Sequence, residues 1–526
     1  MSQKLLKRTA TVGSMTLISR VLGFVRDMVF ARFFGPGLAM DAFFVAFKIP
    51  NFLRRLFAEG AFSQAFVPVL SEYKRQRSEQ DVQDLVDRVS GTLLGILSAV
   101  ALLGVAASPV LVALFAPGFL ADDSKFAVTA QMLRITFPYL LFISLVSFAA
   151  GVLNSYGRFS VPAFAPALLN VTLIGAALWV APSMEQPVVA LAWGVFIAGI
   201  LQLALLVYAL KCLGMMPRPR WGFRDEGVQR ILRLMMPAIF GSSVVQINLL
   251  FDTLIASFLI TGSVSWLYFS DRMVEFPLGV FAIALSTVIL PSLSHSHADG
   301  NRDEFQGTLD WALRWACLVG IPAAIGLFLL AGPVLSTLFE YDRFGAQDVH
   351  LSSLSLMGYA FGLPAFMMVK VLAPGFYSRQ DTRTPVRIGV IAMLANMSLN
   401  IAFVVPMVLW GITGPHAGLA IATSLAAYLN AGMLYRSLYR QDVYRPQPGW
   451  GGFLLRIALG NGVMALLLYW LVAPTEEWSL WGGGARAMQL CGWVVGGALI
   501  YWLIVVSLGI RPRKLGHKSA GTSEQE

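Results

Sequence analysis

Long apolar runs recur along the whole chain and constrain its fold more than any other feature. Each run extends over about 20 residues, which is enough for a helix to cross a hydrocarbon core of about 30 Å. The composition agrees, because 57% of the 526 residues are hydrophobic and only 13% are charged. Soluble domains average about 25% charged residues. The sequence therefore predicts an all-α, polytopic membrane protein.

Polar segments and Pro/Gly breaks divide the chain into about fourteen spans. The expected spans are 9–34, 40–70, 86–115, 127–151, 160–181, 187–212, 228–261, 264–292, 308–338, 349–376, 385–410, 415–438, 451–472 and 487–509. The N-terminus has the general appearance of a signal peptide, but Arg20 and Arg26 interrupt its apolar core and no small-residue cleavage site follows. We expect it to be a retained first membrane helix.

Basic residues are concentrated in alternate connections between the spans. With the N-terminus inside, most of them lie in inward connections, for example Arg158, Arg302 and Arg379, while Lys125, Arg343 and Arg486 fall in outward ones. This asymmetry satisfies the positive-inside rule and predicts that both termini are cytoplasmic. The same distribution argues against nucleic-acid binding despite the net charge of +10, because no soluble basic domain is present.

A weak internal repeat appears at a constant offset of 223 residues. Ser63, Pro68, Leu70 and Ser71 recur as Ser286, Pro291, Leu293 and Ser294, and Ser155 and Pro162 recur as Ser378 and Pro385. Six spans separate the copies, so they share one orientation and predict two lobes related by an axis along the membrane normal. The expected divisions are an N-terminal lobe at 1–224, a C-terminal lobe at 225–446, two further helices at 447–510 and a cytoplasmic tail at 511–526.

The second span carries charge at helical spacing. One face of this helix carries Asp41, Lys48, Arg55 and Glu59. Arg55 and Glu59 are four residues apart, so their opposite charges can neutralise each other. Arg54 points about 100° away from Arg55. Charged residues inside a bilayer are costly and usually line a functional interior. The alternative interpretation is an ion-paired seam that only holds helices together.

The first and eighth spans repeat this pattern. Ser19, Arg20, Arg26 and Asp27 lie in the first span, and Asp271, Arg272 and Glu275 lie in the eighth. Several arginines in these membrane spans, only partly compensated by acids, predict a site for an anion, since guanidinium stays charged and binds phosphate through paired hydrogen bonds. Snorkelling to the membrane surface is the alternative for Arg32 and Lys370.

A second candidate site would hold a small cation. Asp252 is a lone acid in the seventh span, and Asn396, Asn400 and Thr423 could supply further oxygen ligands from the eleventh and twelfth spans. Ordinary interhelical hydrogen bonding is an equally weighted alternative. His295 and His297 lack a carboxylate or Cys partner nearby, so a metal site there is disfavoured. No catalytic motif is present, which favours a transporter driven by an ion gradient or the membrane potential over an enzyme, and no cofactor is implied apart from sodium.

Four stretches, SRVLGFVRD, DAFFVAFKIPNFLRRLFAEGAFSQAFVPVLSEY, SDRMVEFPLGV and KVLAPGFYSRQDTRTPV, carry a family resemblance. They resemble the MurJ (MviN) family of lipid II flippases, within the multidrug/oligosaccharidyl-lipid/polysaccharide exporter superfamily. The resemblance implies a fourteen-helix transporter in the cytoplasmic (inner) membrane of a bacterium. Its substrate would be lipid II, the undecaprenyl-pyrophosphate-linked peptidoglycan precursor, moved outward by alternating access. It also implies contact with membrane lipids and with the cell-wall synthesis machinery.

Matched motif by motif, the resemblance implies a role for individual residues. Arg20, Arg26, Arg54 and Arg272 match cavity arginines that would bind the substrate. Ser19, Asp27, Asp41, Arg55, Glu59, Asp271 and Glu275 would gate the cavity or orient those arginines. Asp252, Asn396, Asn400 and Thr423 resemble a sodium site found in some members, and the last two helices resemble a groove for the lipid tail.

Two rival functions remain open at the level of sequence. A cation-coupled drug or polysaccharide-lipid exporter of the same superfamily would share the architecture, but it would more naturally carry lone acids than arginines. A non-transporting membrane scaffold would use the same charges as structural ion pairs, and the excess of basic residues argues against it.

Overall fold

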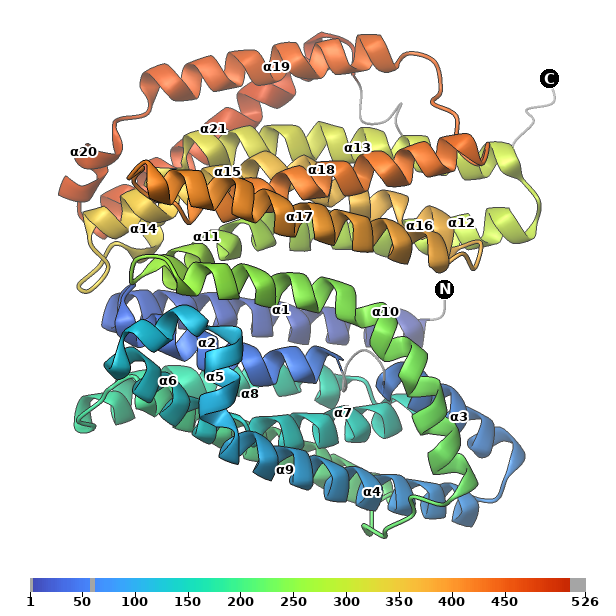
Figure 1. Ribbon diagram of the computed structural model, residues 1–526. Helices are drawn as coiled ribbons and strands as arrows, with labels where there is room; N and C mark the ends of the chain where they lie inside the picture. The colour runs from blue at the N-terminus through green and yellow to red at the C-terminus, as the bar shows by residue number, and fades with distance from the viewer. Residues whose placement is uncertain (1–2, 57–61, 511–526) are drawn as a thin grey trace, which may run out of the picture. The chain divides into compact units, whose positions relative to one another are not determined.

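The computed structural model describes residues 3–56 and 62–510, and its regular secondary structure there is all helical, with no strand (Figure 1). The chain divides into two compact units, Met1–Ser265 and Trp266–Glu526. The all-α prediction is therefore confirmed. The lobe and tail boundaries proposed from the repeat stay predictions.

The helices of the first unit are α1 (Gln3–Phe33), α2 (Leu38–Arg54), α3 (Ser63–Gln76), α4 (Glu79–Ala106), α5 (Ser108–Phe115), η2 (Pro117–Ala121), α6 (Asp123–Thr136), α7 (Tyr139–Ser155), α8 (Ser160–Gly175), η3 (Ala176–Val180), η4 (Ala181–Ser183), α9 (Val189–Leu213) and α10 (Glu226–Ser257). Helix α11 (Ser263–Pro277) begins in this unit and continues into the second. The second unit also contains η5 (Leu278–Ala282), α12 (Ile283–Ala298), α13 (Arg302–Leu329), α14 (Ala331–Phe339), α15 (Ala346–Leu372), α16 (Pro374–Tyr377), α17 (Arg383–Leu409), α18 (Ala417–Arg440), α19 (Trp450–Leu471), α20 (Thr475–Leu480) and α21 (Gly483–Ser507).

Within the described ranges, ten helical segments are long and apolar enough to cross a membrane. This confirms a multi-pass membrane protein. The other four predicted spans fall on α1, α2–α3, α10 and α11–α12. These helices carry most of the charges singled out in the sequence, which lower their hydropathy. The count of fourteen spans stays a prediction.

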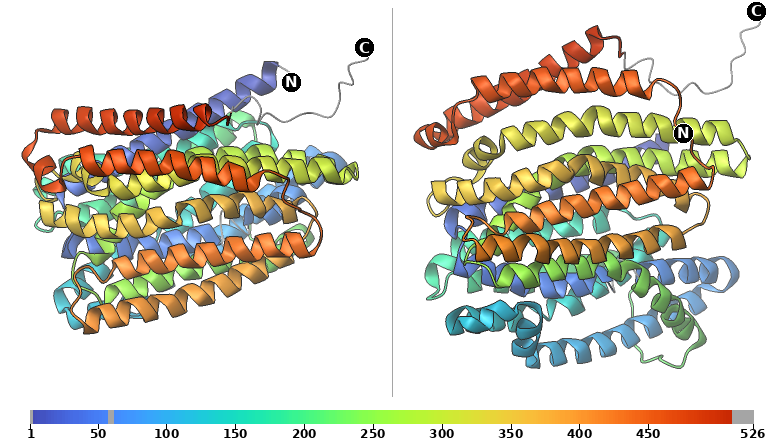
Figure 2. Two further views of the ribbon diagram at one scale, coloured as in Figure 1. Left: turned by 90° about the horizontal axis from the view of Figure 1, so that it is seen from above. Right: turned by 45° about the horizontal axis from the view of Figure 1, so that its top comes forward.

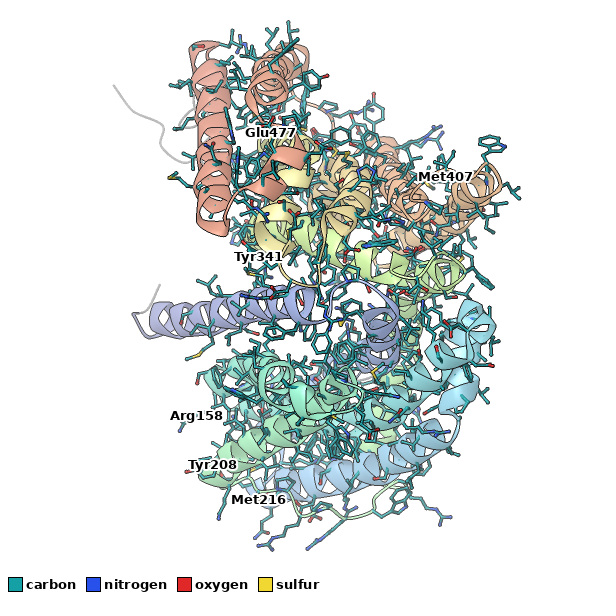
Figure 3. The ribbon with its side chains drawn as sticks, turned by 90° about the vertical axis from the view of Figure 1, so that its left-hand side faces the viewer. Arg158, Tyr208, Met216, Tyr341, Met407 and Glu477 are labelled. Atoms are coloured by element: carbon teal, nitrogen blue, oxygen red, sulfur yellow. The ribbon has the colours of Figure 1, made fainter. Side chains whose placement is uncertain are left out.

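Both copies of the sequence repeat fold as the same local elements. Pro68 lies inside α3 and Pro291 inside α12. The segment from Ser155 to Pro162 joins α7 to α8, and the segment from Ser378 joins α16 to α17. Arg158, in the first of these turns, lies exposed at the surface of the first unit, as does Met216 in the connection after α9 (Figure 3).

Small residues let the helices of each unit pack closely, as is usual where lipid removes the hydrophobic drive for association. In the first unit, a Cβ at Gly199 of α9 would lie 2.9 Å from the ring of Tyr139 on α7. In the second unit, a Cβ at Gly362 of α15 would lie 2.3 Å from Ser424 Oγ of α18, and that hydroxyl donates to the carbonyl of Gly358 at 2.6 Å. Glycine is therefore required at both helix contacts.

Helices α19 and α21 lie side by side on the second unit, against α13 and α14 (Figures 1 and 2). One end of this pair is fastened by Asp310, which lies in α13 and is 1% exposed. Its carboxylate accepts hydrogen bonds from Arg314 Nε at 2.7 Å, Tyr444 Oη at 2.8 Å, Trp450 Nε1 at 2.7 Å and Gln447 N at 3.1 Å. Burial and the Asp310 carboxylate raise the pKa of Tyr444, so the phenol remains a donor. The start of α19 is thereby tied to α13.

The other end of the pair is fastened by Arg486, at the start of α21. This guanidinium is 6% exposed and donates to the carbonyls of Trp478 at 2.8 Å, Ser479 at 2.8 Å, Ser336 at 3.0 Å and Glu340 at 3.0 Å. Glu340 Oε2 lies 3.3 Å from Arg486 Nη1. Arg486 thus joins α14 to α20 and α21, and it is a buried structural residue rather than a loop charge.

Replacing Asp310 should loosen α19 from the second unit. In Asp310→Asn, Arg314 loses its carboxylate partner and one amide must replace an acceptor of four hydrogen bonds, a loss of about 3 kcal/mol. The midpoint of thermal unfolding of the purified protein should fall clearly. Asp303→Asn, an exposed change on the same helix, should leave the midpoint unchanged, and equal midpoints for both variants would contradict this role.

Candidate functional site

Arg26 of α1 is the centre of a buried polar cluster in the first unit. It is 8% exposed, and Asp27 beside it is 2% exposed. Arg26 Nε and Nη2 donate to Asp27 Oδ1 at 3.0 and 2.7 Å, and Nη1 donates to Asn170 Oδ1 of α8 at 3.0 Å. Asn170 Nδ2 in turn donates to the carbonyl of Ser19 at 2.9 Å. Asp27 therefore orients Arg26, and Asn170 joins α8 to the two turns of α1 that carry Ser19 and Arg26.

Gly23 of α1 lies beneath the Asn170 side chain, in a contact that does not itself require glycine. A Cβ at position 23 would lie 3.5 Å from Asn170 Nδ2, an ordinary contact distance. The amide of Asn170 thus lies directly over Gly23, between Ser19 and Arg26. The spacing of these α1 residues, about two turns, matches the reach of one asparagine that donates at one end and accepts at the other.

The other predicted charges of the first unit lie apart from this cluster. Arg20 is exposed on α1. Arg54 is partly buried at the end of α2, and its Nε donates to Asn51 Oδ1 at 2.8 Å. Arg55 is exposed. Glu59, the predicted partner of Arg55, lies outside the described residues, so that pair stays a prediction.

Asp41 of α2 forms a second buried cluster. It is 1% exposed, and Lys125 Nζ of α6 donates to its Oδ2 at 2.9 Å. The same oxygen accepts from Gly262 N at 2.7 Å, while Oδ1 accepts from Ser265 N at 2.9 Å and Ser265 Oγ at 2.7 Å. Asp41 therefore joins α6 to the first turn of α11. An acid at a helix N-terminus also interacts favourably with the helix dipole.

Helix α6 is aligned for this contact by its own N-cap. Asp122 accepts from Ser124 Oγ at 2.6 Å, Ser124 N at 3.0 Å and Lys125 N at 3.1 Å. The hydrogen bond from the Ser124 hydroxyl, followed by those from the backbone, holds the pKa of Asp122 below its usual range. Asp122 therefore remains an ionised cap that fixes the turn from which Lys125 reaches Asp41.

In the second unit, Arg272 is paired within its own helix. Its Nη1 donates to Glu275 Oε2 at 2.5 Å, and the guanidinium lies 4.9 Å from the centre of the Tyr268 ring. About a third of the Arg272 side chain is exposed, and Asp271 and Glu275 are exposed. The acid at position 275 thus orients Arg272 while leaving it accessible. Lys370 is exposed on α15.

The candidate cation ligands lie on three helices. Asp252 is partly buried on α10 of the first unit; Asn396 and Asn400 are buried on α17 of the second unit, and Thr423 lies on neighbouring α18. Among the residues described, no three His, Cys, Asp or Glu side chains gather as a metal site. The expectation that His295 has no carboxylate nearby is wrong, because its Nδ1 lies 2.7 Å from Asp299 Oδ2, one helical turn further on.

Two residues of these clusters, Lys125 and Asn170, were not predicted as site residues from the sequence. Lys125 looked like an ordinary outward charge, but the structure buries it against Asp41. Asn170 lies in an apolar span with no charged neighbour, and its role depends on the packing of α8 on α1. A polar amide in the middle of an apolar run was the only available hint.

The chain is similar to known proteins along almost its full length. The family model described as "Lipid II flippase MurJ" matches residues 30–482. The "Probable lipid II flippase MurJ" of Vibrio cholerae is 48% identical over 98% of both chains. The "Lipid II flippase MurJ" of Burkholderia cenocepacia is 42% identical over 92% of this chain and 93% of its own length.

Solved structures agree with the sequence relatives. A structure described as "Lipid II flippase MurJ, inward closed conformation" covers 94% of this chain and 97% of its own, with a TM-score of 0.78 and 26% identity. An inward-facing multidrug resistance MATE family transporter of the MOP superfamily has a TM-score of 0.65 over 82% of this chain, and its 13% identity makes that a likeness of fold alone. The family match across the chain, and the relatives that share its whole length, together establish that the chain belongs to the lipid II flippase MurJ family.

Proposed function

We propose that this protein is a lipid II flippase, which carries the undecaprenyl-pyrophosphate-linked peptidoglycan precursor from the cytoplasmic to the outer leaflet of a bacterial inner membrane. The observation that carries the proposal is membership of the lipid II flippase family over nearly the full chain. Transport of this kind changes no covalent bond in the substrate, so the protein acts as a transporter and not as an enzyme.

Arginines of α1, α2 and α11 bind the pyrophosphate in this proposal. Arg20, Arg54 and Arg272 are at least partly accessible, whereas Arg26 is buried against Asp27. Guanidinium remains charged when it loses water and forms two parallel hydrogen bonds to phosphate oxygens. Asp27 neutralises Arg26 until the substrate arrives, which limits the cost of holding a charge in the apolar core. Ser19, Asp271 and Glu275 orient the remaining cations.

Asp41 acts as a gate on the side that the positive-inside rule assigns to the outside. Its contacts with Lys125, Gly262 and Ser265 join α2, α6 and the start of α11. Release of the head group requires these contacts to break, after which the same groups meet water. Arg55 and Glu59 are proposed to gate the opposite side. The two predicted lobes alternate between these states.

Sodium is the proposed coupling ion. Asn396 and Asn400 lie one turn apart on α17 and are 1% and 0% exposed. Amide, hydroxyl and carboxylate oxygens are the hard ligands that sodium prefers, and each of the four predicted ligands carries one. Asn396, Asn400, Thr423 and Asp252 would hold it, and the bound charge would favour one conformation over the other.

The number of helices, the location of the termini, the lipid-tail groove and the partners are proposed from the family resemblance. Fourteen helices with both termini in the cytoplasm would leave α19 and α21 as a groove for the lipid tail, and the cell-wall synthesis machinery would take up the flipped product. The fastening of these helices by Asp310 and Arg486 supports the groove, because a fixed pair of helices presents a constant surface to the tail.

Reconstitution into vesicles tests this proposal. We expect outward translocation of lipid II that rises in a sodium gradient, and we expect Asp252→Asn to remove the rise while leaving basal translocation. Transport of a lipid-free cationic drug with no movement of lipid II would favour the rival exporter. Absence of any transport by folded, reconstituted protein would favour the scaffold.

A further inference from the structure

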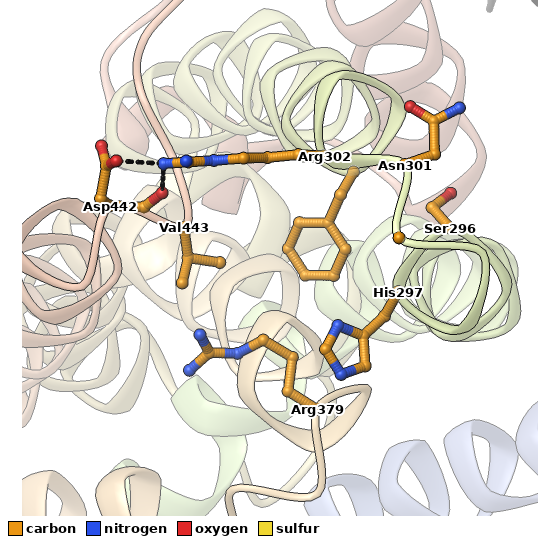
Figure 4. A pocket seen from close by; sticks show the side chains of 9 residues that line it. Ser296, His297, Asn301, Arg302, Arg379, Asp442 and Val443 are labelled. Carbon is orange, nitrogen blue, oxygen red and sulfur yellow. Dashed lines mark hydrogen bonds and ion pairs between the residues drawn. The ribbon is translucent and has the colours of Figure 1, made fainter.

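The second unit contains a pocket at the end that carries Arg302 and Arg379, the end that the positive-inside rule assigns to the cytoplasm. The cavity has a volume of about 210 Å³. Its walls come from the end of α12, the first turn of α13, the turn between α16 and α17, and the residues after α18 (Figure 4). Three segments far apart in the sequence therefore meet around one space: 296–305, Arg379 and 442–443.

Two guanidinium groups and one imidazole line this pocket. Arg302, Arg379 and His297 face it from different sides (Figure 4). Among the described lining residues, Asp442 is the one acid, and it is shared, because both Arg302 and Arg445 form ion pairs with it. One carboxylate between two guanidinium groups leaves a local excess of positive charge.

Arg379 is the lining cation that the protein satisfies least. Its Nη2 donates to the neutral Gln441 Oε1 at 2.5 Å, and its nearest carboxylate, Asp381, lies 3.9 Å away. The side chain is 19% exposed, and Nε is buried without a hydrogen-bond partner in the described part of the chain. A buried donor without an acceptor is destabilising, and burial lowers the pKa of Arg379. A ligand that accepted this hydrogen bond would recover that cost.

We propose that this pocket binds a phosphate group, with Arg379 as the principal ligand and Arg302 and His297 as further donors. Tetrahedral phosphate matches the forked geometry of guanidinium and offers acceptors in several directions. Its source is either the headgroup of an anionic phospholipid in the cytoplasmic leaflet or a soluble phosphate. A bound phosphate would join the inner ends of α12, α13, α17 and α18, and would stabilise the second unit. None of the arginines proposed to bind the transported substrate lines this pocket.

Thermal unfolding of the full-length protein in phosphate-free neutral detergent tests this site. The probes are sodium phosphate, compared with sodium chloride at equal ionic strength, and phosphatidylglycerol, compared with phosphatidylcholine. In the wild type, a phosphate-bearing probe should raise the unfolding midpoint to a plateau. In Arg379→Gln, the dissociation constant from that titration should increase at least about tenfold, because a charge-assisted hydrogen-bond pair is lost. Arg436→Gln, an exposed change on α18, should bind as the wild type does.

The two sources give different results. A plateau with sodium phosphate alone identifies a soluble phosphate, and a plateau with phosphatidylglycerol only identifies a lipid headgroup. Arg379→Lys keeps the positive charge but loses Nε and the forked guanidinium, so it should weaken phosphate binding by a factor between those of the wild type and Arg379→Gln. It takes the place of Arg379→Gln if that variant fails to fold. No plateau with either probe in the wild type, or equal binding by wild type and the Arg379 variants, would overturn the proposal whatever the protein transports.

Discussion

Arg26→Ala should abolish lipid II translocation in reconstituted vesicles, with a loss of at least about 100-fold. The substitution removes a guanidinium that is 8% exposed and held by Asp27 and Asn170. Two charge-assisted hydrogen bonds to the substrate, at about 1.5–3 kcal/mol each, are enough for that loss. Arg32→Ala changes an exposed arginine at the far end of the same helix, so it should transport at nearly the wild-type rate.

Folding and substrate binding can be separated at this position. Arg26→Ala leaves Asp27 as a buried charge without its guanidinium partner, which costs about 3–5 kcal/mol of stability. The double variant Arg26→Ala with Asp27→Ala removes that cost and should unfold at a higher temperature than the single variant. It should still fail to transport. Transport by the stable double variant would show that Arg26 serves only as a structural partner of Asp27.

Asp41→Asn should open the predicted outer gate. The amide cannot neutralise Lys125. It keeps one acceptor oxygen, so its NH₂ group must face either Gly262 N or Ser265 N, a donor set against a donor. Breaking a buried pair in this way costs about 3–5 kcal/mol, so the closed state should lose population. Lipid II transport should fall, because a gate that no longer closes cannot alternate.

Labelling from outside the vesicle can report the state of this gate. Thr129→Cys places a thiol at a position that is 0% exposed, one turn beyond Lys125, after Cys212, Cys317 and Cys491 are changed to Ser. An impermeant maleimide should react at least about tenfold faster when Asp41→Asn is added. Asp123→Asn, an exposed change nearby, should leave the rate unchanged. Equal labelling rates with and without the Asp41→Asn substitution would contradict the gate.

The fold class could be predicted because each membrane span must satisfy its own backbone, so apolar length reports helices directly. The ten apolar spans show this. The charged helices α1, α2 and α11 are not among these ten spans, and they were placed from the polar and Pro/Gly breaks beside them. The turns between helices near Ser155 and Ser378 were also predicted, because a Ser, a basic residue and a Pro recur there at the same offset of the repeat.

The partners of the charges could not be predicted, because they depend on tertiary packing. The α1 charges gave no reason to choose Asn170, which lies 144 residues from Arg26. Asp41 was predicted to be a gating residue. Its partners could not be predicted, because Lys125 and Ser265 lie on two other helices, α6 and α11, that only the folded chain brings next to α2. Arg486 was expected in an outward connection, and Asp310 carried no prediction. Only their burial and hydrogen bonds show that they hold α19 and α21 in place.

Direct binding of lipid II is the measurement that tests the pyrophosphate site most closely. Purified protein should be titrated with lipid II and with an analogue in which an uncharged linker replaces the pyrophosphate. We predict that wild type binds lipid II at least about tenfold more tightly than the analogue, and that Arg20→Ala, Arg54→Ala and Arg272→Ala each reduce this preference. Equal affinity for the two ligands, unchanged by the arginine substitutions, would contradict the account.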